Sequence, residues 1–206
     1  MKTLITIDPN QNTEKENYKF LTGTIIPRPI AFVTTADSKG RPNGAPFSYF
    51  NVVCANPPLI SISVQRSSGH LKDTARNIFE TKEFVVHVVD QTNVEQINQT
   101  AAPLPPHENE LELAKLTAVL STKVSVPGIK EAKVRMECLL EEALELGGSG
   151  EEPACDLIIG RVVQFHIDHD IYKDGKTDPQ GLGAVSRLAG HDYATIGQPF
   201  EIKRPE

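Results

Sequence analysis

The chain of 206 residues has no tryptophan, only three cysteines and no apolar run long enough to cross a membrane. The cysteines are odd in number and form no CxxC pair, which argues against a disulfide framework and is typical of a reducing compartment. The apolar run at the N-terminus is broken too soon to form a signal peptide. We therefore expect a cytoplasmic protein that does not enter a membrane.

Neither sign of charge dominates the composition. The formal net charge is −6, with 39% hydrophobic and 23% charged residues, which is ordinary for a globular protein. A mildly acidic chain lacks the broad basic face that nucleic-acid binding needs, so we expect no nucleic-acid partner. A chain of about 200 residues can form one core. We expect a single domain over residues 1–206, with a leader (1–22) and a C-terminal tail (175–206) packing on it.

The sequence also lacks the glycine-rich motifs GxGxxG and GxxxxGK[ST], which disfavours a Rossmann dinucleotide site or a P-loop. Apolar or alternating patterns predict strands at residues 30–35, 42–51, 59–65, 84–89, 134–141 and 156–167. The stretch 42–51 is extended but interrupted by proline and glycine. Shorter helical patterns cover 71–79, 92–100 and 108–116. Many strands with few helices predict a mainly β fold, an antiparallel barrel.

One candidate binding segment lies between a predicted strand and a predicted helix. It carries cations and hydroxyls together, namely Gln65, Arg66, Ser67, Ser68, His70, Lys72, Asp73 and Thr74. A phosphate group needs such side chains, and the unpaired N–H groups of a helix N-terminus favour it further. The alternative interpretation is purely structural: Ser67 or Ser68 caps the helix while Arg66 and Lys72 are solvated.

The second candidate segment combines aromatic and polar side chains, Phe47, Ser48, Tyr49, Phe50 and Asn51. Such a run can hold a flat polar ring by stacking on its face and by hydrogen bonds to its edge. The alternative is that Phe47 and Phe50 belong to the core and Tyr49 is half-buried.

Both segments belong to a longer pattern that resembles the flavin reductase-like family. The resemblance is carried, in order and spacing, by residues 22–35, 43–51, 56–63 and 72–78. Two weaker matches follow at 98–102 and 186–193, where Ala189 replaces an expected glycine. The resemblance implies a split barrel that binds flavin mononucleotide (FMN), a six-stranded antiparallel Greek-key barrel. It also implies a homodimer with the flavin near the interface.

By the same resemblance, specific side chains are expected to contact the cofactor. The flavin ring and ribityl chain would meet Ser48, Tyr49, Phe50 and Asn51. The phosphate would lie among Gln65, Arg66, Ser67, Ser68, His70, Lys72, Asp73 and Thr74. Arg28 would lie near the flavin, and Asn98 and Thr100 would reach it from the partner subunit.

The implied activity is that of an NAD(P)H:flavin reductase, which passes hydride from the nicotinamide to N5 of FMN. Because the flavin carries the chemistry, no catalytic side chain is expected. An FMN-binding, storage or electron-carrier protein without turnover is the alternative, and a pyridoxamine-phosphate oxidase-like barrel is a more remote one. No metal site is expected: His87 on an apolar strand is better explained as a hydrogen-bonded core residue, and the ligand-type residues 166–170 divide between strand faces.

Overall fold

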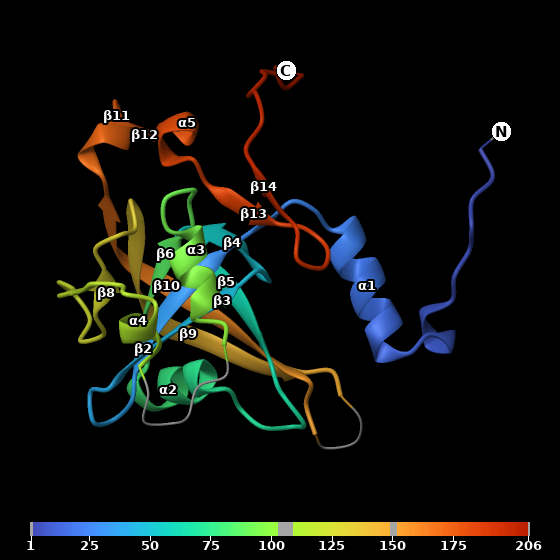
Figure 1. Cartoon of the computed structure of the whole chain (residues 1–206), viewed down its shortest axis with the longest axis horizontal. Coiled ribbons are helices and arrows are strands. Elements are labelled where there is room, and N and C mark those ends of the chain that lie inside the picture. The colour runs from blue at the N-terminus through green and yellow to red at the C-terminus, as the bar shows by residue number, and fades with distance from the viewer. Residues whose placement is uncertain (1, 103–108, 149–151, 206) are drawn as a thin grey trace.

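The computed structural model of the chain describes residues 2–102, 109–148 and 152–205. Its body is a seven-stranded antiparallel sheet with the order β3-β2-β6-β9-β10-β5-β4 (Figure 1). The strands are β2 (Ala31–Ala36), β3 (Pro42–Phe47), β4 (Phe50–Ala55), β5 (Pro58–Gln65), β6 (Glu83–Val88), β9 (Val134–Leu146) and β10 (Cys155–Ile167). The predicted mainly β, antiparallel class is confirmed.

The sheet curls on itself because its two edge strands are neighbours in the chain. β3 ends at Phe47 and β4 begins at Phe50, yet these strands lie at opposite ends of the sheet order. Only Ser48 and Tyr49 separate them, so the two edges must meet. The N–H of Ser63 on β5 donates to the carbonyl of Tyr49 at 2.9 Å, which helps to close this seam.

The same seam explains why the sheet has seven strands and not the six that were predicted. The sequence suggested one interrupted extended stretch over 42–51. In the structure the stretch is two strands on different edges, because the chain turns at Ser48–Tyr49 to cross from one edge to the other. The proline and glycine residues of this stretch lie on the edge strand β3, since proline cannot donate a backbone hydrogen bond to a neighbouring strand and glycine weakens a strand interior.

The core lies inside the curled sheet and under the helix α2 (Asp73–Thr81). Strand β5 alternates as its sequence predicts: Ile60, Ile62 and Val64 are buried, whereas the intervening side chains face outward. Helix α2 contributes Ala75 and Ile78 to the same cluster, and its predicted position is confirmed.

His87 on β6 is fully buried, as predicted for a core histidine. Its Nδ1 lies 3.0 Å from the carbonyl of Phe32, and the N–H of Ile129 donates to its Nε2 at 3.0 Å. Since Nε2 accepts, Nδ1 must carry the proton, and the ring is neutral. Burial lowers the pKa of His87 to about 4.

Two short helices cover part of the sheet beside β3. The predicted helix 92–100 is confirmed as α3 (Val94–Gln99). The predicted helix 108–116 is α4 (Glu110–Leu113), shorter than expected, and residue 108 lies outside the described residues.

Shorter elements frame the barrel and carry the C-terminal tail. They are β1 (Arg28–Pro29), β7 (Ala118–Val119), β8 (Gly128–Ile129), the 3-10 turn His169–Ile171, β11 (Tyr172–Lys173), β12 (Lys176–Thr177), α5 (Pro179–Leu182), β13 (Val185–Arg187) and β14 (Tyr193–Thr195). In the tail, β13 pairs with β1 and β14, and the N–H of Val185 donates to the carbonyl of Val89. The tail therefore packs on the barrel up to β14, whereas residues 196–205 are exposed.

The N-terminal segment behaves differently from the expected leader. A 3-10 turn (Pro9–Gln11) precedes helix α1 (Glu14–Thr24), which projects from the barrel with its N-terminal end farthest away (Figure 1). Only Thr22 of α1 is buried. The expectation that residues 1–22 pack on the body is therefore wrong for 2–22 within a single chain. No described helix is long and apolar enough to span a membrane.

Candidate flavin site

A row of polar side chains follows the outer face of β5. Ser61, Ser63 and Gln65 point away from the core, opposite to Ile62 and Val64. Gln65 donates from Nε2 to the hydroxyl of Ser63 at 3.0 Å. Their alternation is visible in the sequence, but Ser61 and Ser63 were not among the predicted ligands.

Pairing with β4 extends this row toward the aromatic segment. Asn51 lies directly opposite Ser61, and residues opposite each other share a face. Tyr49 lies beside Ser63, through the hydrogen bond at the seam. Phe50 pairs with Ile62 and packs on the core instead. Of the predicted ring ligands, Tyr49 and Asn51 therefore join the row, whereas Phe50 faces the core.

The row continues into a tight turn at residues 67–70. Ser67 and His70 exchange backbone hydrogen bonds of 3.3 and 3.0 Å, and Ser68 and Gly69 both have positive φ, 51° and 74°. This is the type I′ geometry of a two-residue hairpin. Ser67 and Ser68 are therefore not the cap of α2, which corrects the structural alternative. We call Tyr49, Asn51, Ser61, Ser63, Gln65, Ser67 and His70 together the polar strip.

Arg66 points to the opposite face of the sheet from the polar strip. Its Nε and Nη2 donate to the buried carboxylate of Asp156 at 3.0 and 2.6 Å, and Nη2 also meets Glu145 at 2.6 Å. The hydrogen bonds to Asp156, followed by those to Glu145, raise the pKa of the guanidinium. With two carboxylates around it, Arg66 has little positive charge to offer a phosphate.

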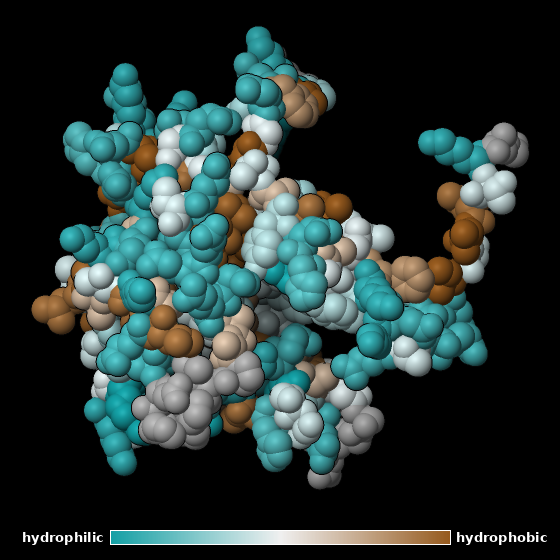
Figure 2. Space-filling model, viewed as in Figure 1, coloured by the Kyte–Doolittle hydropathy of each residue, from teal (hydrophilic) through white to brown (hydrophobic). Residues whose placement is uncertain are grey.

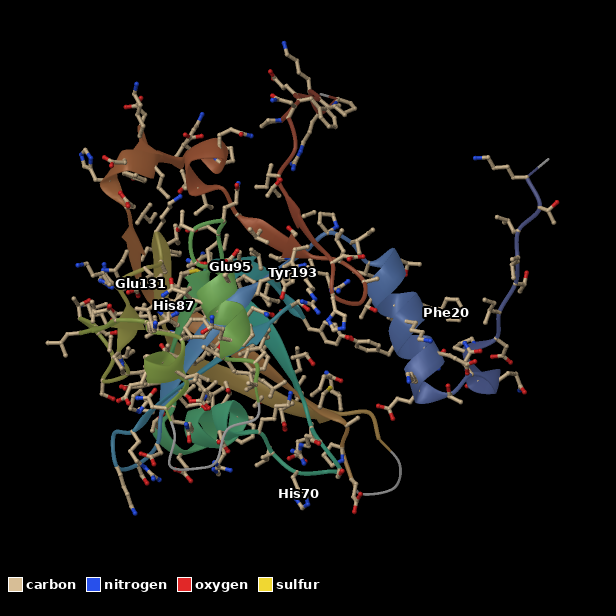
Figure 3. All side chains as sticks on the ribbon, in the orientation of Figure 1. Phe20, His70, His87, Glu95, Glu131 and Tyr193 are labelled. Atoms are coloured by element: carbon tan, nitrogen blue, oxygen red, sulfur yellow. The ribbon has the colours of Figure 1, made fainter. Side chains whose placement is uncertain are left out.

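The remaining cations lie at the start of α2. Lys72 is the N-cap residue and no side chain caps the helix, so the N–H groups of its first turn keep their capacity for an anion. His70 and Lys72 are both exposed, and Figure 3 shows His70 at the outer tip of this region. The predicted ligands Asp73 and Thr74 face elsewhere: Asp73 pairs with Arg76, and the buried Thr74 hydroxyl is hydrogen-bonded to the side-chain amide of Asn43.

Arg28 is buried and serves as a backbone clamp. Its Nη1 donates to the carbonyls of Thr22 and Ile25, at 2.7 and 2.6 Å, and its Nη2 donates to that of Leu188 at 2.8 Å. Its Nε has no partner among the described residues. Burial, and then the neighbouring Tyr18, raise the pKa of Tyr49, and the Arg28 guanidinium partly opposes this rise. Arg28 is thus close to the aromatic segment, but its three hydrogen bonds all go to backbone carbonyls of its own chain.

The two residues expected to reach a partner's flavin differ in accessibility. Asn98 on α3 is exposed and accepts from the Tyr193 hydroxyl at 2.9 Å, and the Arg187 guanidinium stacks over the Tyr193 ring. Thr100 is buried and donates its hydroxyl to the carbonyl of Ile97. A side chain so enclosed cannot touch a ligand on another subunit, and we leave Thr100 out of the proposed site.

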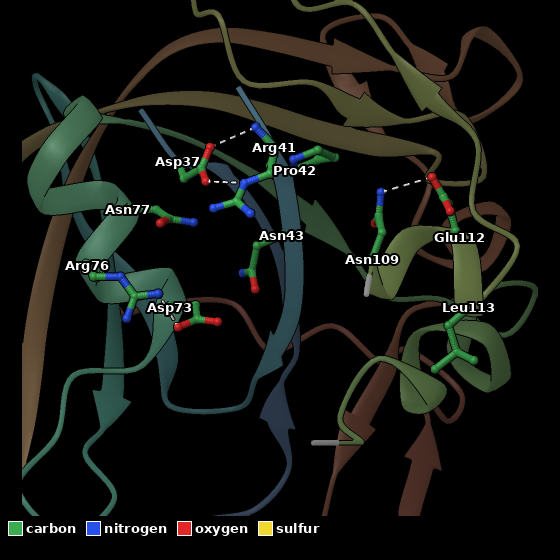
Figure 4. Close-up of a pocket in the computed structure, with 10 residues that line it drawn as sticks. All are labelled: Asp37, Arg41, Pro42, Asn43, Asp73, Arg76, Asn77, Asn109, Glu112 and Leu113. Carbon is green, nitrogen blue, oxygen red and sulfur yellow. Dashed lines mark hydrogen bonds and ion pairs between the residues drawn. The ribbon is translucent and has the colours of Figure 1, made fainter. Parts of the chain in front are cut away.

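Two pockets of the described chain lie away from the polar strip. One, of about 680 Å³, lies between β3, α2 and α4, and both of its arginines, Arg41 and Arg76, are paired with aspartates (Figure 4). The other, of about 670 Å³, lies around the C-terminal end of β10, where His166 contacts Glu137 at 2.6 Å. The described residues contain no group of three or more metal-ligating side chains. No residue of the polar strip lines either pocket, and all seven are exposed or half-buried, so the strip faces solvent.

A family model described as a flavin reductase like domain matches residues 22–180. The chain belongs to the flavin reductase-like family. The match covers the polar strip, the turn and both long strands, so the family resemblance in the sequence is confirmed.

Individual known proteins are similar to this chain over nearly its whole length. The crystal structure of nitrilotriacetate monooxygenase component B from Bacillus cereus is 58% identical, with a TM-score of 0.96, and the alignment covers 98% of this chain and 100% of that one. The uncharacterized protein YwrF of Bacillus subtilis is 52% identical over 95% of this chain and 97% of its own. A putative flavin reductase with a split barrel domain from Shewanella frigidimarina has the same fold, with 23% identity, a TM-score of 0.83, and coverage of 95% and 96%.

The family implies a flavin cofactor, and the residues present fit one. The polar strip offers hydroxyls and amides along one strand face, with Tyr49 at one end, while Ser67, His70, Lys72 and the uncapped start of α2 lie at the other. A flavin nucleotide has a flat ring with polar edges at one end and a phosphate at the other end of its ribityl chain. Hydroxyls along the middle suit its ribityl chain, so both ends of the strip match the group in chemical character.

Proposed function

We propose that the chain is an FMN-dependent oxidoreductase that takes electrons from NADH or NADPH. The single observation that carries this proposal is the polar strip, which joins an aromatic–amide end to a cationic turn on a chain of the flavin reductase-like family. Bound FMN would supply the redox chemistry, because N5 of its ring can accept a hydride from the nicotinamide.

The protein's own contribution is position and electrostatics. Tyr49 and Asn51 would hold the ring, and Ser61, Ser63 and Gln65 would bind the ribityl hydroxyls. Ser67, His70, Lys72 and the first turn of α2 would hold the phosphate. Arg66 would keep the turn in place through Asp156, without touching the ligand.

We further propose that the protein acts as a homodimer of single-domain subunits. An open strip leaves one face of a flavin in water, and a second subunit can cover it. The similarity to component B of a monooxygenase supports a role in which reduced flavin is passed to a monooxygenase partner. A cytoplasmic location remains a prediction from the cysteines.

The direct test is spectroscopic. The purified full-length protein is titrated with FMN, and NADH or NADPH is then added without oxygen. Binding followed by bleaching of the flavin band is the expected result. Binding without bleaching would support the non-catalytic carrier instead, and the absence of binding would refute both.

A second experiment tests the cationic end of the strip. Replacing His70 and Lys72 together by alanine should weaken FMN binding about tenfold or more, because charge-assisted hydrogen bonds to the phosphate are lost. Riboflavin, which has no phosphate, should bind both proteins equally. Lys39→Ala, an exposed lysine in the β2–β3 turn, is the matched control. Equal weakening for FMN and riboflavin would contradict this placement of the phosphate.

A further inference from the structure

The segment before the barrel is well formed, although it buries almost nothing in its own chain. We call residues 2–26 the arm. Helix α1 of the arm starts with a complete capping box, in which the Thr13 hydroxyl accepts from the N–H of Glu16 and the Glu16 carboxylate accepts from the N–H of Thr13. An isolated helix of 11 residues is marginal in water even with such a cap. The arm therefore needs a further surface to stabilise it.

The other end of α1 is fixed to the barrel by a buried cation. Arg28 binds the carbonyls of Thr22 and Ile25 on one side and that of Leu188 in the tail on the other. These three bonds set the angle at which the arm leaves the body. A fixed angle reduces the entropy lost when the arm binds something, which is the advantage of preorganisation.

The arm exposes a stripe of large apolar side chains. Tyr18, Leu21 and Ile25 are spaced three and four residues apart and so share one face of α1, and all three are more than half exposed. Leu4 and Ile5 in the preceding segment are about 85% exposed. Figure 2 shows apolar side chains along the N-terminal stretch, and Figure 3 shows Phe20 on α1 far from the barrel residue His87.

The barrel carries an uncovered apolar face of its own. The register of β9 and β10 places Leu146 opposite Cys155 and Leu144 opposite Leu157, all on the outer side of the sheet. Ile159 shares this side, and none of the five is buried. We call these five side chains the open sheet face. It borders the polar strip directly, since Cys155 pairs with Gln65 and Leu157 pairs with Ser63.

We propose that the arm docks on the open sheet face of a second copy of this chain. Eight large apolar side chains of the arm are exposed: Leu4, Ile5, Ile7, Tyr18, Phe20, Leu21, Ile25 and Ile26. Their exposed fractions add up to about five whole side chains, which at about 60–120 Å² each can bury on the order of 400 Å². Because each copy in a twofold pair would bury both its own arm and its own open sheet face, each would bury roughly twice that area, close to the ~800 Å² that each partner contributes to a standard interface. In a twofold pair each copy gives one arm and receives the other, so both exposed surfaces are covered at once.

The charges at the two surfaces are complementary. Lys15 and Lys19, one helical turn apart, flank the apolar stripe of α1. Glu142 lies on the same side of the sheet as Ile159, and Glu152 is exposed beyond the start of β10. Opposite charges at the rim of an interface favour the correct pairing and orientation.

The docked arm would lie beside the polar strip of the receiving subunit. It would supply the cover that an open flavin site lacks, so the site is incomplete without the second copy. This part of the inference rests on the proposed function, whereas the docking itself does not.

The test uses full-length variants measured by sedimentation velocity, with FMN binding as a separate readout. Leu21→Glu on the arm and Leu144→Glu on the open sheet face should each weaken self-association about 100-fold or more, because a twofold pair loses two buried leucines. Leu120→Glu, at an equally apolar but remote exposed position, is the matched control and should associate like the unaltered chain. Thermal unfolding of each variant verifies that it folds.

Mixing the two variants identifies the docking surfaces. A mixed pair retains one intact contact, between the arm of the Leu144→Glu chain and the face of the Leu21→Glu chain. The mixture should therefore recover association that neither variant shows alone. Unchanged association of Leu21→Glu, or no recovery on mixing, would overturn the proposal. If the unaltered chain associates through the arm but binds no FMN, the proposed function fails and the docking stands.

Discussion

Mild acid should lower the free energy of unfolding through the buried ring of His87, at a pH where most carboxylates are still ionised. His87 is neutral in the folded chain, because its Nε2 accepts from the N–H of Ile129 while its Nδ1–H donates to the carbonyl of Phe32. Burial lowers the pKa of His87 from 6.5 to about 4. Between these two pH values the unfolded chain takes up a proton that the folded chain cannot, so the free energy of unfolding falls as the pH falls.

The size of the effect follows from the shift. A difference of about 2.5 pH units corresponds to about 3 kcal/mol, fully present above pH 6.5 and lost by about pH 4. A loss of this size is a large fraction of the 5–15 kcal/mol that stabilises a typical domain. Most of it should occur above pH 4.5, the pH at which ordinary glutamates are about half protonated.

The assay is urea unfolding at one protein concentration, followed by far-ultraviolet circular dichroism from pH 7.5 to 4.5. His87→Gln keeps an acceptor and a donor but does not titrate, so its stability should be lower at neutral pH and much less dependent on pH. His70→Gln, at an exposed histidine, is the control and should follow the unaltered chain. If His87→Gln shows the same pH slope as the unaltered chain, the argument from the buried ring is wrong.

Two further substitutions test the packing, both by urea unfolding. Asp156→Asn should destabilise the protein by clearly more than the ~1 kcal/mol typical of an exposed ion pair, since it leaves Arg66 with a neutral, buried neighbour; a smaller loss would refute the role assigned to this pair. Gly160→Ala should cost about 1–3 kcal/mol, because the new methyl group would lie 2.3 Å from the Phe84 ring. Gly23→Ala in α1, where nothing lies within 4 Å, is its control and should be neutral or stabilising.

Much of the barrel could be predicted because its strands obey local rules. Ile60, Ile62 and Val64 alternate with polar residues, and this period of two is readable without any tertiary information. The apolar stripe of α2 was equally clear. The division of residues 42–51 between two edges could not be predicted, since it depends on how the whole sheet closes.

The candidate site shows the same division between local and distant causes. The polar face of β5 is present in the sequence pattern, although only Gln65 on that face was predicted as a ligand and Ser61 and Ser63 were not. The pairing of Arg66 with Asp156 and Glu145 joins residues 90 and 79 positions apart, so its charge appeared free when only neighbours were considered. Ser67 and Ser68 looked like helix caps, but a hairpin turn with two left-handed residues competes with that role.

The dipeptide Ser48–Tyr49 couples two properties that many proteins vary separately. It joins the opposite edges of the sheet, and it also orients Tyr49 outward and Phe50 inward. Because side chains along a strand alternate between faces, inserting one residue there would exchange the two rings. The length of this connection is therefore constrained both by the closure of the sheet and by the orientation of the two rings. New ligand specificities should arise more readily from substitutions on β5 than from insertions at Ser48–Tyr49.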